Sequence, residues 1–171
     1  MSDIRQGKQR VDRVVICGSM SCYQQMLECQ QTLRDFGVPS VAPVPEGAHT
    51  ENLSPERFRH FKSVVSAKWL KEIRRNVTFG ILVVNEPKRQ QNNYIGANTF
   101  AEIAVAFCAG KAIYLLRSCF SVYEDELRAW GAVELDGDRH ELALDFAHVM
   151  ALRDEAAALR ASQLVFDLRD R

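Results

Sequence analysis

Apolar residues along the chain fall into two alternating patterns, which together predict alternating strands and helices. Residues 11–17 form a mostly apolar run, and residues 79–85 and 112–116 are continuous apolar runs of strand length. Continuous runs of this kind are typical of strands buried on both faces of a parallel sheet. We predict three strands here, with residues 79–85 as the central one, and two weaker strands at 38–45 and 132–135.

Apolar residues at helical spacing occupy the segments between these strands. Ser54 followed by Pro55 predicts a helix that runs to about Arg75, because serine caps a helix start and proline tolerates the first helical position. The predicted inward stripes are Phe58, Phe61, Val65, Trp69 and Ile73 in this helix, and Leu142, Phe146, Val149 and Leu159 in a C-terminal helix at about 139–162. Further helices are predicted at 20–36, at 122–130 and in the segment that ends at Gly110.

The repeated order of strand and helix predicts one α/β domain over residues 1–171, preceded by a polar leader at 1–10. The expected architecture is a three-layer sandwich, flavodoxin-like or Rossmann-like, with a mostly parallel sheet of about five strands. Ligands of such folds bind beyond the carboxyl ends of the strands, where the strand order reverses. The loops that follow residues 11–17 and 79–85 should therefore line one crevice.

The composition of the chain excludes several classes of binding partner. Lysine plus arginine and aspartate plus glutamate number 22 each, so no net charge attracts a nucleic acid polymer or an anionic membrane. The chain has no apolar run of membrane-spanning length, and its polar start lacks the apolar core of a signal peptide, so we expect a cytoplasmic protein. Its five cysteines and four histidines show no metal-ligand spacing, and the glycine motifs of dinucleotide and P-loop sites are missing. We expect neither a metal nor a cofactor.

Glu102 is the single charged residue between Arg89 and Lys111. Its spacing from Thr99 fits a capping box, in which the glutamate bonds the backbone N–H of the cap residue. Alternatively, Glu102 is a carboxylate in the first helical turn, kept ionised by the helix dipole and able to attack an electrophilic carbon. Spacing alone does not choose between these interpretations.

Two polar loops flank the predicted crevice. The first contains Gly18, Ser19 and Met20, whose backbone and hydroxyl groups suit a phosphate, a carboxylate or a base edge, although Ser19 can equally cap its own helix. The second loop is richer in polar side chains and contains a glycine that lets backbone approach a ligand. Its residues include Asn92, Asn93, Tyr94, Gly96, Asn98 and Thr99, and it begins at Asn85. We interpret the charge clusters Arg74-Arg75 and Lys88-Arg89 as solvated.

Three segments, VVICGSM (14–20), ILVVN (81–85) and NYIGANTFAEIAVAFCAGKAIYLL (93–116), resemble the nucleoside 2-deoxyribosyltransferase-like superfamily. This superfamily includes the 2'-deoxynucleoside 5'-phosphate N-hydrolases, and the likeness is closest to a prokaryotic branch with the signature Y-I-G-x-N-T-x-x-E. The resemblance spans residues 14–116. It implies a flavodoxin-like fold, and homo-oligomers (a dimer or larger) in which a neighbouring subunit helps to complete the site.

The implied reaction is cleavage of a nucleoside or nucleotide N-glycosidic bond. Glu102 matches the glutamate that attacks the anomeric carbon of the sugar. The base then leaves, and another base or water resolves the glycosyl-enzyme. The expected substrate contacts are Gly18, Ser19, Met20, Asn85, Tyr94, Gly96, Asn98 and Thr99.

The chain departs from the family pattern in three places. Lys71, with Glu72 beside it, stands where the family has an aspartate that assists the leaving base. Gly96 replaces an acidic or hydroxyl residue six positions before the nucleophile, and an aromatic hydroxyl is missing around Val15. Tyr94 or Glu72 could supply the missing acid. The alternative is a non-catalytic module that binds or senses nucleotides, in which Glu102 binds a ribose hydroxyl or closes the capping box.

Overall fold

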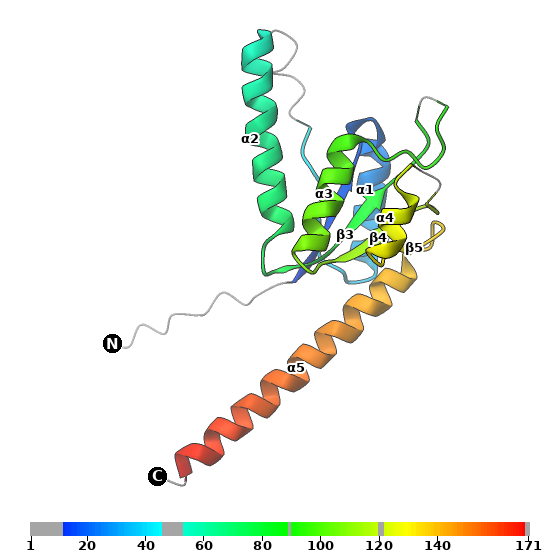
Figure 1. Cartoon of the computed structure of the whole chain (residues 1–171). Coiled ribbons are helices and arrows are strands. Elements are labelled where there is room, and N and C mark those ends of the chain that lie inside the picture. Colours follow the sequence, from blue (N-terminus) through cyan, green and yellow to red (C-terminus); the bar gives the residue numbers. More distant parts are fainter. Residues whose placement is uncertain (1–11, 46–52, 89, 120–121, 170–171) are drawn as a thin grey trace.

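Five parallel strands form one sheet with helices on both faces in the computed structural model, which describes residues 12–45, 53–88, 90–119 and 122–169 (Figure 1). The strands are β1 (Arg13–Gly18), β2 (Ser40–Val41), β3 (Thr78–Val84), β4 (Ala112–Leu115) and β5 (Val133–Glu134). Their order is β2-β1-β3-β4-β5, with every neighbouring pair parallel. The predicted three-layer α/β sandwich with β3 at its centre is thereby confirmed.

The helices also follow the predicted segments. They are α1 (Tyr23–Asp35), preceded by the 3-10 turn η1 (Met20–Cys22), then α2 (Pro55–Ile73), α3 (Ala97–Cys108), α4 (Glu124–Ala129) and α5 (His140–Arg169). Ser54 caps α2 as predicted, because its side chain accepts a hydrogen bond from the Arg57 N–H. The predicted loop at 46–52 and the leader at 1–10 lie outside the described residues.

Each face of the sheet packs against its own set of helices. On one face α1 and the start of α5 bury Met26, Leu33, Leu142 and Phe146 against alternate residues of β1 and β3. On the other face, the end of α2 together with α3 and α4 buries a second set, which includes Ile73, Ile103, Ala106 and Leu127. This alternation places Cys17 of β1 beneath α2 and α3, on the second face.

The sheet reverses its strand order between β1 and β3. These two strands pair over their whole length, from Arg13 to Gly18 on β1. At Gly18, φ is +155°, and a Cβ atom would lie 2.9 Å from both the Met26 Cε atom and the Val84 carbonyl oxygen. Glycine at this position therefore lets the ends of β1 and β3 approach closely, which is where ligands bind in doubly wound sheets.

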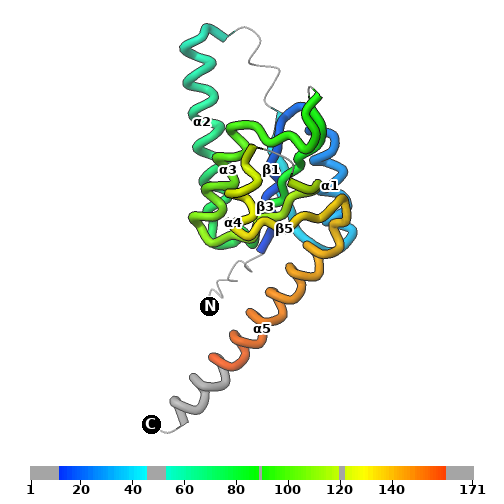
Figure 2. Tube along the Cα trace, turned by 45° about the vertical axis from the view of Figure 1, so that its right-hand side comes forward, coloured from blue at the N-terminus to red at the C-terminus, as the bar shows by residue number. Residues whose placement is uncertain are grey.

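Two helices extend past the sheet, and here the predicted inward stripes are partly wrong. In α2, Ile73 is fully buried but Phe58 is 43% exposed, because the first half of the helix projects beyond the carboxyl edge of the sheet (Figure 1). In α5, Leu142 is fully buried but Leu159 is 63% exposed, because the helix leaves the sheet in the opposite direction (Figure 2). No helix within the described part of the chain has the length and apolar character needed to cross a membrane.

Candidate functional site

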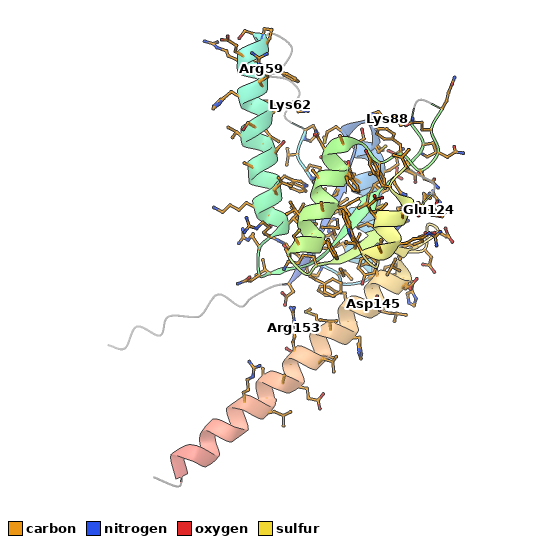
Figure 3. The ribbon with its side chains drawn as sticks, viewed as in Figure 1. Arg59, Lys62, Lys88, Glu124, Asp145 and Arg153 are labelled. Atoms are coloured by element: carbon orange, nitrogen blue, oxygen red, sulfur yellow. The ribbon has the colours of Figure 1, made fainter. Side chains whose placement is uncertain are left out.

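The two polar loops meet at the carboxyl edge of the sheet, as predicted. Lys88, in the loop after β3, donates a hydrogen bond from Nζ to the Ser19 Oγ atom, 2.7 Å away, in the loop after β1. Figure 3 shows Lys88 at the end of the sheet from which α2 projects. The contact joins residues 69 positions apart, at the edge where the strand order reverses.

The first loop presents two hydroxyl groups at this edge. Ser19 caps η1 by accepting a hydrogen bond from the Ser21 N–H at 3.4 Å, and the two serine Oγ atoms lie 2.9 Å apart. Met20, between them, is 48% exposed. The capping interpretation of Ser19 is therefore seen in the structure, and its Oγ atom also faces the Lys88 ammonium.

The second loop is held firmly in place. The backbones of Lys88 and Gln91 exchange two hydrogen bonds of 2.9 Å, and the Asn93 side chain donates to the Ser118 carbonyl at 2.8 Å. Gln90 and Asn93 take left-handed backbone conformations, with φ of 64° and 53°. These contacts hold the turn at Lys88 together and tie the loop to the segment that follows β4.

Asn85 is fully buried and links two strands of the sheet. Its Oδ1 atom accepts from the Arg117 N–H at 2.8 Å and its Nδ2 atom donates to the Arg117 carbonyl at 3.0 Å, which joins the ends of β3 and β4. Both ends of its amide are thus engaged, so the structure gives this predicted substrate contact a scaffold role.

The start of α3 corrects both interpretations of Glu102. Gly96 is the N-cap residue, without a side-chain cap, so Thr99 is the third residue of the helix and is buried. The capping box is wrong, because Thr99 does not occupy the cap position. The first-turn placement is also wrong, because Glu102 is the sixth residue of α3 and lies in the second turn. Asn98 stands exposed in the first turn.

Glu102 points into the protein against the end of β1. Its Oε2 atom is buried and has no hydrogen-bond partner among the described residues. Its carboxyl group accepts a hydrogen bond from the thiol of Cys17, whose sulfur in turn accepts one from the Trp69 side chain on α2. A buried carboxyl oxygen without a donor is unusual, since such groups are nearly always satisfied.

Burial governs the protonation of Glu102. Loss of hydration raises the pKa of this carboxyl from 4.5 to about 7, and the hydrogen bond from Cys17 opposes the rise only in part. The expectation that the helix dipole keeps Glu102 fully ionised is therefore wrong, because desolvation outweighs it. Burial likewise raises the pKa of Cys17 well above its ordinary value, which keeps Cys17 a thiol and a donor.

Tyr94 fills the space beside Gly96. A Cβ atom at Gly96 would lie 2.9 Å from the Tyr94 hydroxyl oxygen, and the ring of Tyr94 has the Lys88 ammonium 5.0 Å from its centroid. The Tyr94 phenol thus lies next to Gly96, the position at which the superfamily that this chain resembles carries an acidic or hydroxyl side chain.

Glu72, the other candidate acid, is at the wrong edge of the sheet. Its carboxylate pairs with Arg13, the first residue of β1, and its carbonyl accepts from the hydroxyl of Thr78, the first residue of β3. The length of β1 separates this edge from Gly18 by roughly 16 Å, at about 3.3 Å per residue. The structure therefore excludes Glu72 as the acid of this crevice.

Lys88 is the site residue that sequence reasoning missed. We predicted a solvated Lys88-Arg89 cluster, but Lys88 is half-buried and bonded to Ser19; Arg89 lies outside the described residues. The available signal was its place three residues after the central strand, in a loop already expected to line the crevice.

The described residues contain no group of three or more histidine, cysteine, aspartate or glutamate side chains placed to hold a metal ion. Comparisons of the chain with protein-family models, with curated proteins and with solved structures found no match.

Replacement of Glu102 by glutamine tests the burial of its charge. Glu102 ionises more readily in the unfolded chain than in the folded protein, so its contribution to folding stability falls as the pH rises from about 4.5 through about 7. Over this window the stability of Glu102→Gln relative to wild type should rise by about 3 kcal/mol. Denaturant unfolding at pH 4.5 and pH 8 measures the difference.

Glu126, an exposed carboxylate of α4, provides the control, and Glu126→Gln should leave the pH dependence of stability unchanged. If Glu102→Gln and Glu126→Gln behave alike across this window, Glu102 is not buried as described.

Proposed function

We propose that this protein cleaves the N-glycosidic bond of a nucleoside or nucleotide with Glu102 as the nucleophile, as a transferase or a hydrolase. The observation that carries the proposal is the buried carboxyl group of Glu102, whose Oε2 atom lacks a partner among the described residues. It lies against the end of β1, where doubly wound sheets bind ligands. The resemblance of residues 14–116 to the nucleoside 2-deoxyribosyltransferase-like superfamily supports the same assignment.

In the proposed reaction the ionised Glu102 carboxylate attacks the anomeric carbon and forms a glycosyl ester. The bond to the base breaks with its electron pair moving to the base nitrogen, which takes a proton from the Tyr94 hydroxyl. A second base or a water molecule then attacks the same carbon, gives its proton to the Tyr94 phenolate and releases Glu102. With a pKa of about 7, Glu102 is roughly half ionised at neutral pH, so the nucleophilic form is present there.

A non-catalytic nucleotide-binding module is the second candidate. The raised pKa of Glu102 favours it, because a protonated carboxyl group donates a hydrogen bond to a ligand but does not attack carbon. Gly96 also brings no side chain of its own to protonate a leaving base. This candidate binds nucleotides without releasing a free base.

We also propose a homo-oligomer in which a second copy covers the projecting half of α2. Phe58 and Val64 are 43% and 53% exposed there, beside a shallow apolar hollow that Leu53 and Phe61 line. This half of α2 stands at the same end of the sheet as Lys88, so a partner bound to it would lie next to the crevice (Figure 3).

Base release tests the enzyme proposal directly. Incubation with deoxynucleosides and their 5'-monophosphates, followed by chromatography, should show a free base. Glu102→Ala and Glu102→Gln should each reduce kcat/KM by at least about 10³-fold, since neither side chain attacks carbon. The wild-type rate should rise with pH through about 7, as Glu102 ionises.

Glu126→Gln, on α4, is the matched control and should keep full activity. Activity retained by Glu102→Gln would refute the nucleophile assignment. Tight nucleotide binding without base release would instead support the non-catalytic module.

Tyr94→Phe tests the acid. Loss of the hydroxyl should lower kcat by about 10²-fold with little change in KM, because a positioned acid acts on the departing base and not on substrate binding. Glu72→Gln is the control and should leave kcat unchanged. If Glu72→Gln lowers kcat and Tyr94→Phe does not, Tyr94 is not the acid.

Light scattering coupled to size exclusion tests the oligomer. The wild-type protein should elute at twice the monomer mass or more, and Phe58→Asp should shift it toward monomer by weakening association at least about tenfold. Val44→Asp, at a 75% exposed site outside α2, should have no effect. A monomeric wild type, or equal effects of both variants, would contradict an interface on α2.

A further inference from the structure

We propose that α5 pairs with the same helix of a second copy of this chain in a parallel coiled coil. The pairing surface consists of Val149, Leu152, Ala156 and Leu159, which we call the α5 stripe. This surface lies away from the crevice, so the inference goes beyond the proposed function and does not depend on it.

The first argument is the spacing of the α5 stripe. Its members follow one another at intervals of three, four and three residues, which is the a and d pattern of a coiled coil. In the sequence, Phe166 continues this pattern seven residues after Leu159, and residues 149–169 of α5 make up three heptads. A strict seven-residue repeat keeps the apolar positions on the seam that faces a second helix.

The second argument is the exposure of the α5 stripe. Residues 151–160 are all exposed, and Leu152 and Leu159 are 51% and 63% exposed. Beyond the sheet, this part of α5 extends away from the rest of the protein (Figure 2). A helix gains most of its stability from packing of its apolar face, and a free segment of this length is marginal in water. A second helix against the α5 stripe supplies that packing.

The third argument is the direction of the α5 stripe, which the body of the protein leaves open. Met150 packs against the core and Arg153 pairs with Asp12 at 2.9 Å, so these residues mark the side of α5 that faces the body (Figure 3). At 3.6 residues per turn, the centre of the α5 stripe lies roughly 110° around the helix from that side. A second helix can therefore lie beside α5 without displacing the body.

The fourth argument is the charge beside the α5 stripe, which favours a second copy in parallel orientation. Glu155 occupies a g position and Arg160 the next e position, and both are exposed. In a parallel pair, each g residue lies beside the e residue five positions further along the other helix, so Glu155 meets Arg160 of the second copy. An antiparallel pair would bring e positions together, and Arg153 and Arg160 both occupy e positions.

This pairing leaves the crevice uncovered. The helix α5 leaves the sheet in the direction opposite to the projecting half of α2 (Figure 1). The two copies are therefore joined at the end of the sheet opposite to the crevice. The contact is separate from the one that we propose on α2.

Cysteine cross-linking of the full chain tests the pairing. Cys108 is the exposed native cysteine of the described residues, so Cys108→Ser provides the background. In this background, Leu152→Cys should form an intermolecular disulfide with oxidised glutathione, because equivalent d positions of a parallel pair face each other. Asp154→Cys, which is exposed on the opposite side of α5, is the matched control and should not cross-link.

A second measurement uses light scattering and circular dichroism. Leu152→Asp should weaken association through α5 at least about tenfold and lower the helical signal, because the unpaired end of the helix unfolds. Leu144→Asp is the control, at a 58% exposed site of the same helix outside the α5 stripe, and should behave like wild type. Phe58→Asp should leave the Leu152→Cys cross-link intact, because α2 is not part of this contact.

Equal cross-linking of Leu152→Cys and Asp154→Cys would overturn the inference, as would loss of the Leu152→Cys cross-link in Phe58→Asp. If Leu152→Cys does not cross-link and Leu152→Asp associates like wild type, the α5 stripe does not bind a second copy. Neither outcome bears on base release, so failure of this inference is distinguishable from failure of the enzyme proposal.

Discussion

Burial of the Glu102 carboxyl group against the end of β1 is the interaction on which the site depends. The group lies on the face of α3 that packs toward Cys17, and Trp69 of α2 bonds the same Cys17 sulfur. Desolvation raises its pKa to about 7, so ionisation at neutral pH works against folding. An apolar side chain at this position would avoid that cost. A carboxyl group with a strongly perturbed pKa at the reversal point of a doubly wound sheet is typical of a functional group.

The close approach of β1 and β3 links this carboxyl group to the rest of the crevice. Gly18 lets the two strand ends meet, and the residues on either side of it serve different partners: Cys17 faces Glu102 beneath the helices, while Ser19 faces Lys88 at the open edge. One strand end thus sets the spacing between a carboxyl group and an ammonium group. Tyr94 lies beside both Lys88 and Gly96, so its side chain lies between the Lys88 ammonium and the backbone at the start of α3.

The strands and the meeting of the two polar loops could be predicted from sequence because their signals are local. The apolar run at 79–85 has the length and continuity of a central strand, and the loops after two parallel strands must share one edge. The projecting half of α2 could not be predicted, because periodicity identifies a helix face but not how far the sheet extends beneath it. Phe58 fits the apolar stripe and is nevertheless 43% exposed.

The predictions about the site that were wrong concern features that depend on contacts between distant segments. Thr99 matches a capping box by spacing, but the helix begins at Ala97 because Gly96 takes the extended cap conformation. Lys88 looks solvated by composition, and only its approach to Ser19, 69 residues earlier, gives it a place in the crevice. Likewise, the protonation of Glu102 follows from the depth at which α3 and α2 bury it.

The most direct measurement is an NMR titration of the Glu102 side chain in protein labelled with ¹³C at the glutamate carboxyl carbons, with Glu102→Gln providing the assignment. We predict a titration midpoint near pH 7 in the free protein. A midpoint near the ordinary value of 4.5 would show a hydrated carboxylate, and would contradict the buried, functional carboxyl group that we describe.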